Sequence, residues 1–193
     1  PEHTGVLIFA HDNSEAQSLK ASFESGGYPV EIVEIETSAG EFADVLGRAA
    51  TKYPKGLALV YLGGMKVEPA SEDGLASSFF RFWELARALV ETDIEAARLA
   101  VVCSSSLQFS PVPGAVAATM LGMLRVLPKE MPSLSVRYVD LDSQASEAIA
   151  NTTLRMVAAD VLDGFKIEVE QQPRALDDDY EKVRVSCYRR GQR

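Results

Sequence analysis

Apolar runs and amphipathic stretches alternate along most of the chain. Uninterrupted apolar runs are typical of strands buried on both faces, and alternating runs are typical of strands with one covered face. Apolar residues three and four positions apart predict helices. The predicted strands are residues 5–10, 30–35, 56–62, 99–103, 134–141, 165–169 and 182–188, and the predicted helices are 14–25, 38–53 or 41–53, 75–92, 113–131 and 143–162. This order predicts an α/β fold, in which a parallel sheet carries helices on both faces.

The helix predicted over residues 75–92 has an unusually wide apolar face. Phe82 and Leu89 belong to one stripe at helical spacing, and Phe80 and Trp83 lie beside that stripe. Such a helix either packs between the sheet and another element or offers part of its surface to a partner. Core packing is the favoured interpretation, because the helix precedes a central strand and is expected to cross the sheet.

The length of 193 residues suits one domain with a short appendage. We expect residues 1–170 to form the domain. Residues 171–193 are expected to form a solvated linker with three consecutive aspartates, followed by a strand that leads toward a further domain. A loop is expected over residues 65–74.

Composition excludes several classes of function. The formal net charge of −9 and the lack of a basic stripe argue against nucleic-acid binding. The chain contains neither an apolar run long enough to span a membrane nor the features of a signal peptide, so we expect a cytoplasmic protein without membrane contact.

The cysteines and histidines give no metal or disulfide pattern. Cys103 lies in a predicted buried strand and Cys187 lies far from it along the chain, which favours two reduced thiols. His3 and His11 have no partner at the spacing that zinc ligands require, so no metal-binding residue is predicted.

The turn after the first strand lacks the residues that a dinucleotide needs. A pyrophosphate is held by backbone amides in a glycine-rich turn at a helix N-terminus, but no glycine occurs between Ala10 and Gly26. Asp12 and Glu15 would repel a phosphate. No cofactor-binding residue is therefore predicted.

Residues 99–142 form a predicted strand, helix and strand that resemble the site of a short-chain reductase. In those enzymes a Ser ends the strand, a Tyr about twelve residues later donates a proton, and a Lys one turn after it lowers the Tyr pKa. Ser104, Ser105 and Ser106 could supply the first group, but the other two positions hold Val116 and Met120. No catalytic residue is therefore predicted, and the favoured role of the serines is to cap the strand end.

Nearly the whole chain resembles the structural subdomain of the ketoreductase region of modular polyketide synthases. The matching pieces are residues 56–62, 82–86 and 99–103, the residues Ala118, Gly122, Arg125, Val126, Glu130 and Pro132, the run Val139, Asp140, Leu141 and Asp142, and the C-terminal run 188–193. The family usually has a Trp near the start of its central helix, and this chain has none there. That departure makes a divergent pseudo-ketoreductase a second possibility.

The resemblance implies a truncated Rossmann-like, short-chain-reductase-like fold that acts as a scaffold without catalysis. In this family the structural half binds no cofactor and supports a second half, which binds NADPH and carries out the reduction. The partners implied are that catalytic subdomain and neighbouring synthase domains, including an acyl carrier protein.

Two alternatives remain open from the sequence. The first is a pseudo-ketoreductase remnant that serves as a spacer beside a methyltransferase or dehydratase. The second is a small-molecule-binding or catalytic α/β domain with its site at Ser104, Ser105 and Ser106, because open α/β sheets bind ligands at the carboxyl ends of their strands.

Overall fold

Helices and strands alternate along the chain in the order that the sequence predicts. The computed structural model describes residues 4–11, 14–35, 39–64, 72–94, 97–104, 113–141, 155–156, 158–159, 161 and 183–188. The elements are β1 (Thr4–Ala10), α1 (Ser14–Ser25), β2 (Val30–Glu34), α2 (Ala39–Lys52), β3 (Gly56–Gly64), α3 (Glu72–Thr92), β4 (Ala97–Ser104), α4 (Pro113–Glu130), β5 (Ser135–Leu141) and β6 (Val183–Tyr188).

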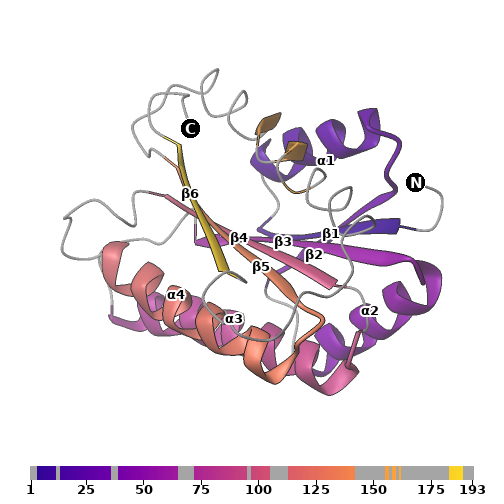
Figure 1. Ribbon diagram of the computed structural model, residues 1–193. Coiled ribbons are helices and arrows are strands. Elements are labelled where there is room, and N and C mark those ends of the chain that lie inside the picture. Colours follow the sequence, from indigo (N-terminus) through magenta and orange to yellow (C-terminus); the bar gives the residue numbers. More distant parts are fainter. Residues whose placement is uncertain are drawn as a thin grey trace.

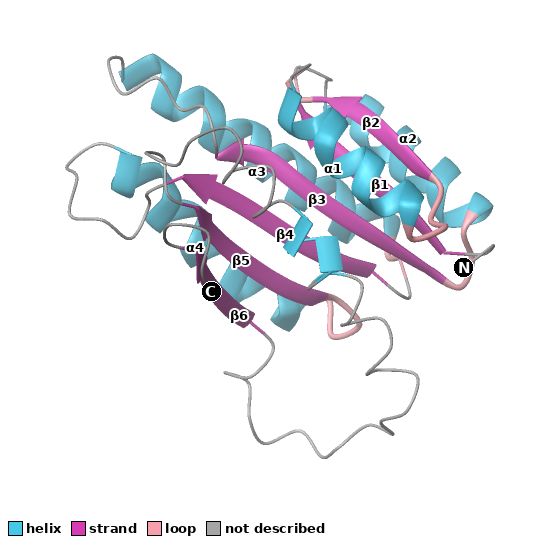
Figure 2. Cartoon of the chain, turned by 90° about the horizontal axis from the view of Figure 1, so that it is seen from above, coloured by secondary structure: helices cyan, strands magenta, loops and turns pink. Residues whose placement is uncertain are grey.

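The strands form one parallel sheet in the order β2-β1-β3-β4-β5-β6 (Figures 1 and 2). The chain moves outward from β1 to β2, returns past β1 to β3, and then proceeds to the opposite edge. This arrangement confirms the predicted α/β fold with a Rossmann-like parallel sheet.

The sheet separates two apolar cores. Helices α2, α3 and α4 cover one face, where the largest buried side chains include Phe9, Phe42, Phe82 and Tyr138. Helix α1 covers the other face together with helical residues at 156, 158 and 161. Figure 1 shows α1 above the sheet and the three other helices below it. Strands covered on both sides explain the uninterrupted apolar runs in the sequence.

Some element boundaries differ from the expected ones. Helix α3 begins at Glu72, so residues 72–74, which were expected to belong to a loop, are helical. The residue types at 72 and 73, Glu and Asp, favour the first turn of a helix because they complement its dipole.

The C-terminal strand joins the main sheet. Strand β6 pairs with β5 and forms one edge. The predicted helix 143–162 is described only at residues 155–156, 158–159 and 161, which are helical. The predicted strand 165–169, the linker at 171–180 and the boundary at residue 170 lie outside the described residues.

Candidate functional site

The carboxyl edge of the sheet is the place where a ligand is expected. Open parallel sheets bind ligands beyond the carboxyl ends of their strands, where the chain reverses its direction across the sheet. Here that switch point lies between β1 and β3, because α1 and α3 cover opposite faces. The candidate site therefore consists of the last residues of β1, β3, β4 and β5.

The end of β1 leads directly into an acidic helix start. His11, which follows β1, is half-buried, and α1 begins at Ser14 with Glu15 in its first turn. A carboxylate at this point complements the helix dipole, which a phosphate would otherwise do. The residue types at this end of β1 therefore disfavour a pyrophosphate.

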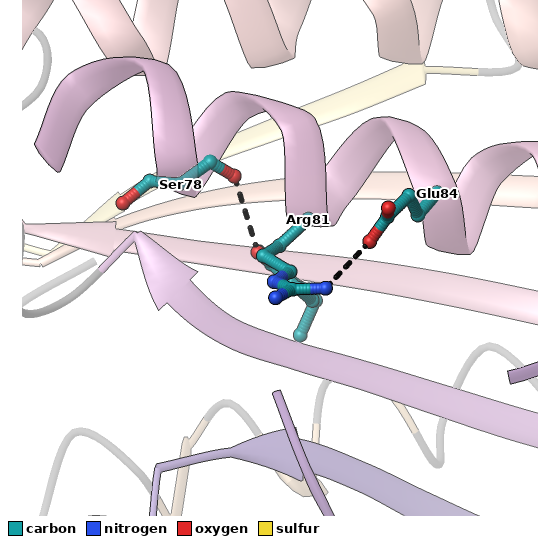
Figure 3. Close-up of polar contacts among 4 residues, drawn as sticks. Ser78, Arg81 and Glu84 are labelled. Atoms are coloured by element: carbon teal, nitrogen blue, oxygen red, sulfur yellow. Dashed lines mark hydrogen bonds and ion pairs between the residues drawn. The ribbon is translucent and has the colours of Figure 1, made fainter. Parts of the chain in front are cut away.

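The end of β3 is occupied by a tyrosine ring. A Cβ atom on the buried Gly63 would lie 2.4 Å from the ring of Tyr61, so this position accepts only a glycine without movement of the ring. The Tyr61 hydroxyl donates a long hydrogen bond of 3.4 Å to the carbonyl oxygen of Ser78 on α3. Figure 3 labels Ser78 and draws this bond as the dashed line that starts at its carbonyl oxygen. Its ring also packs against Phe82, with 5.1 Å between the ring centroids. Tyr61 thus fills the space between β3 and α3 beside the switch point.

The ends of β4 and β5 carry a buried polar cluster of Cys103, Tyr138 and Asp140. Cys103 and Asp140 are register partners on the two strands, and all three residues are almost completely inaccessible to solvent. Alternation along β5 places Asp140 on the same side as Tyr138, which belongs to the core under α3 and α4. The buried Arg98 lies near the other end of β4, so it is far from Asp140 along the sheet.

The thiol in this cluster is held in its protonated form. The pKa of Cys103 is raised from its ordinary value of 9.0 to about 12. Burial is the largest cause, the charge of Asp140 acts in the same direction, and a side-chain hydrogen bond with Tyr138 partly opposes the rise. Thiolates, and not thiols, act as nucleophiles and metal ligands. The cluster therefore has the chemistry of a packed polar interior and not that of an activated nucleophile.

The residues singled out in the sequence occupy different environments. Ser104 is the last residue of β4; its side chain, together with Ser105 and Ser106, lies outside the described part of the chain. Met120 is completely buried in the core between α4 and the sheet. Val116 belongs to α4, but its side chain is not among those described.

The sequence reasoning missed the pairing of Cys103 with Asp140 and the position of Tyr61. The sequence did contain a signal for these residues. Tyr61, Cys103 and Asp140 each lie near the carboxyl end of a strand that the sequence predicts. The register that makes Cys103 and Asp140 neighbours depends on strands more than thirty residues apart, and no local pattern specifies it.

The described residues contain neither a metal-binding cluster nor a membrane-spanning helix. Among them, no group of three or more His, Cys, Asp or Glu side chains could hold a metal ion. Over the same residues, no helix has both the length and the apolar character needed to cross a membrane.

Comparison with known proteins shows the fold. No protein-family profile and no curated protein matches the chain. The chain is similar to an A1-type ketoreductase (19% identity, TM-score 0.52) and to A-type ketoreductases from a modular polyketide synthase (19% identity, TM-score 0.53). In each case the match covers 80% of this chain but only 34% of the other, so the chain spans about a third of their length.

The chain is also similar to a small-chain dehydrogenase in complex with NADPH. That match has a TM-score of 0.58 at 10% identity and covers 98% of both chains. At such identities the likeness establishes a ketoreductase-like and short-chain-dehydrogenase-like fold.

Proposed function

We propose that this chain is a non-catalytic supporting domain of a polyketide synthase ketoreductase region, which stabilises and positions a separate NADPH-dependent reductase half. The observation that carries the proposal is the end of β1, where α1 starts with an acidic turn and the sequence offers no glycine before Gly26. A dinucleotide needs backbone amides at this point, and neither the turn nor the charge suits it.

Two further observations support the proposal. Met120, at the position where a short-chain reductase carries its lysine, is part of the apolar core and has no group that can perturb a proton donor. The similar ketoreductases are about three times as long as the match, which leaves room in such proteins for a second half that does the chemistry.

A reconstitution experiment tests the supporting role. The polypeptide encoded directly after Arg193 is produced with and without this chain, and its NADPH-dependent reduction of a β-keto thioester is measured. We expect the chain to increase the activity and the thermal stability of that polypeptide, because contact between the two removes apolar surface from water. Heat-unfolded chain serves as the control.

The alternatives predict different results. A downstream polypeptide with full activity in the absence of this chain would contradict the supporting role. A downstream polypeptide without a reductase would instead favour a pseudo-ketoreductase remnant. Reduction of the β-keto thioester by this chain alone, or turnover of another ligand, would favour a catalytic site near Ser104.

A further inference from the structure

The C-terminal end of helix α2 carries three exposed cations, which we call the cationic cluster: Arg48, Lys52 and Lys55. Arg48 and Lys52 lie one helical turn apart, and Lys55 follows the last residue of the helix by three positions. Within the part of the chain that the structure describes, none of the three forms an ion pair. Their positive charges are therefore not neutralised by direct contact.

Cations without an ion pair are unexpected in an acidic chain. The sequence has 28 acidic and 19 basic residues, so a carboxylate is usually within reach of a cation. Other described cations do form ion pairs, which are Lys20 with Glu24 (3.8 Å), Arg81 with Glu84 (2.9 Å, Figure 3) and Arg87 with Glu91 (2.7 Å). Arg48 and Lys52 are instead like charges four residues apart on one helix, an arrangement that destabilises the helix. A negatively charged partner would relieve this repulsion.

The neighbouring acids do not neutralise the cationic cluster. Asp44 precedes Arg48 by one turn of α2 and is exposed, but it forms no ion pair with a described residue. Glu31 on the edge strand β2 favours the charged form of Lys52 through its field, and it also forms no ion pair with a described residue. This end of α2 therefore keeps a net positive charge on a chain whose formal charge is −9, and it attracts acidic groups.

The side chain of Lys52 is held in place by its neighbour. Its Nζ atom lies over the ring of Tyr53, 5.1 Å from the centroid. A side-chain hydrogen bond with Tyr53 is the largest cause that raises the pKa of Lys52 above 10.5. Tyr53 is buried, and a Cβ atom on Gly5 would collide with its ring, so the glycine lets this ring pack against β1. A cation that is positioned before binding loses less conformational freedom when a partner binds.

The spacing of the cationic cluster matches a helix with acidic residues. The three positions follow one another at intervals of four and three, the intervals at which side chains share one face of a helix. Arg48 and Lys52 are separated by about 6 Å along the axis of α2, and Lys55 continues the row past the end of that helix. A row of this kind favours several carboxylates along a partner helix over a single phosphate group. Such charge pairs set the rate and the register of docking.

We propose that an acidic helix of a partner protein, with carboxylates at intervals of four and three residues, docks on the cationic cluster. Lys55 directly precedes β3, so this docking surface lies at the edge where the strands begin, away from the candidate functional site at their carboxyl ends. The inference goes beyond the supporting role, because that role requires neither this surface nor an acidic partner.

The test is an NMR titration of the whole isotope-labelled chain with three synthetic alanine-rich helical peptides. The matched peptide carries three glutamates at intervals of four and three, the second carries three glutamates on different sides of its helix, and the third carries lysines at the matched positions. We expect the matched peptide to bind at least about fivefold more tightly than the second, with shifts centred on residues 44–55. The third peptide should not bind. Raising the ionic strength to about 0.3 M should weaken the matched peptide about tenfold.

Two charge reversals locate the interaction. Lys52→Glu should weaken binding of the matched peptide about tenfold or more, because it replaces an attraction by a repulsion. Lys129→Glu is the matched control, since Lys129 is also an exposed basic residue in the last turn of its helix and also forms no ion pair with a described residue. Both changes therefore have the same effect on a helix dipole. Helix α3 lies between α2 and α4, so Lys129→Glu should change the affinity less than about twofold. Circular dichroism and thermal unfolding show that both variants are folded.

Each other outcome overturns the proposal. Equal affinity for the two glutamate peptides, or binding that Lys52→Glu leaves intact, would reveal a general attraction for acidic chains. Absence of saturable binding of the matched peptide at low ionic strength would show that no such docking surface exists. Displacement of the matched peptide by an equal or lower concentration of inorganic phosphate would assign the cationic cluster to a small anion. None of these results concerns NADPH or a reductase half, so the supporting role is tested separately.

Discussion

At the scale of single residues, buried polar and glycine positions decide the character of the strand ends. Cys103 was expected to be buried, and it is. Its contact with Tyr138 and its proximity to Asp140 could not be read from the sequence, because they depend on the register of β4 against β5. The need for a glycine at position 63 arises in the same way, from the rotamer of a ring two residues away.

The buried thiol predicts a loss of stability in alkali. Its pKa is 9.0 in the unfolded chain and about 12 in the folded chain, so only the unfolded state loses this proton as the pH rises above 9. The free energy of unfolding should therefore fall by about 1.4 kcal/mol per pH unit from this group between pH 9 and 12. Urea denaturation across this range measures the slope.

The variant Cys103→Ala isolates the contribution of the thiol, since the remaining groups titrate as before. The difference in the free energy of unfolding between the unsubstituted chain and Cys103→Ala should narrow steadily above pH 9. Parallel stability profiles for the two proteins would show that the thiol is not held in its protonated form by the fold.

The close approach at Gly63 predicts a coupled pair of substitutions. Gly63→Ala should cost about 1–3 kcal/mol, because the new methyl group displaces the Tyr61 ring from a packed core. In a Tyr61→Leu background the same substitution should cost at least about 1 kcal/mol less. Urea denaturation of the four proteins gives the coupling.

A matched substitution on α2 serves as the control. At Gly47 a Cβ atom would meet nothing within 4 Å, so Gly47→Ala should stabilise the chain by about 0.5–1 kcal/mol through helix propensity. Equal effects at positions 47 and 63 would refute the steric account.

At the scale of elements, periodicity predicted the type and order of almost every described helix and strand. It also separated two stripes on α3, with Phe82 and Leu89 in one and Phe80 and Trp83 in the other. The first stripe is buried, as predicted, whereas the second is exposed. Periodicity identifies the residues that share a face of a helix. Whether another element covers that face depends on the whole fold.

Neighbouring aromatic residues on α3 should therefore respond differently to truncation. Phe82→Ala should lower the free energy of unfolding by about 3–5 kcal/mol, because it leaves a cavity beside Tyr61. Phe80→Ala should change it by less than about 0.5 kcal/mol, because the Phe80 side chain is exposed. A large loss from Phe80→Ala would mean that the Phe80 side chain is covered by another part of the chain.

At the scale of the whole molecule, the pattern of alternating strands and helices was sufficient to predict a parallel sheet with helices on both faces. The strand order β2-β1-β3-β4-β5-β6 and the place of β6 in that sheet required the structure. The candidate site, too, could be predicted from the sequence only in part. The lack of a glycine turn after β1 is visible in the sequence, whereas the tyrosine that fills the end of β3 is visible only in three dimensions.

The most direct test of the central claim is calorimetric titration of the purified chain with NADPH and with NADH, with a cofactor-binding short-chain dehydrogenase measured under the same conditions. The account predicts saturable heat for the dehydrogenase and none for this chain up to millimolar cofactor. Saturable binding of either cofactor by this chain with micromolar affinity would contradict the account.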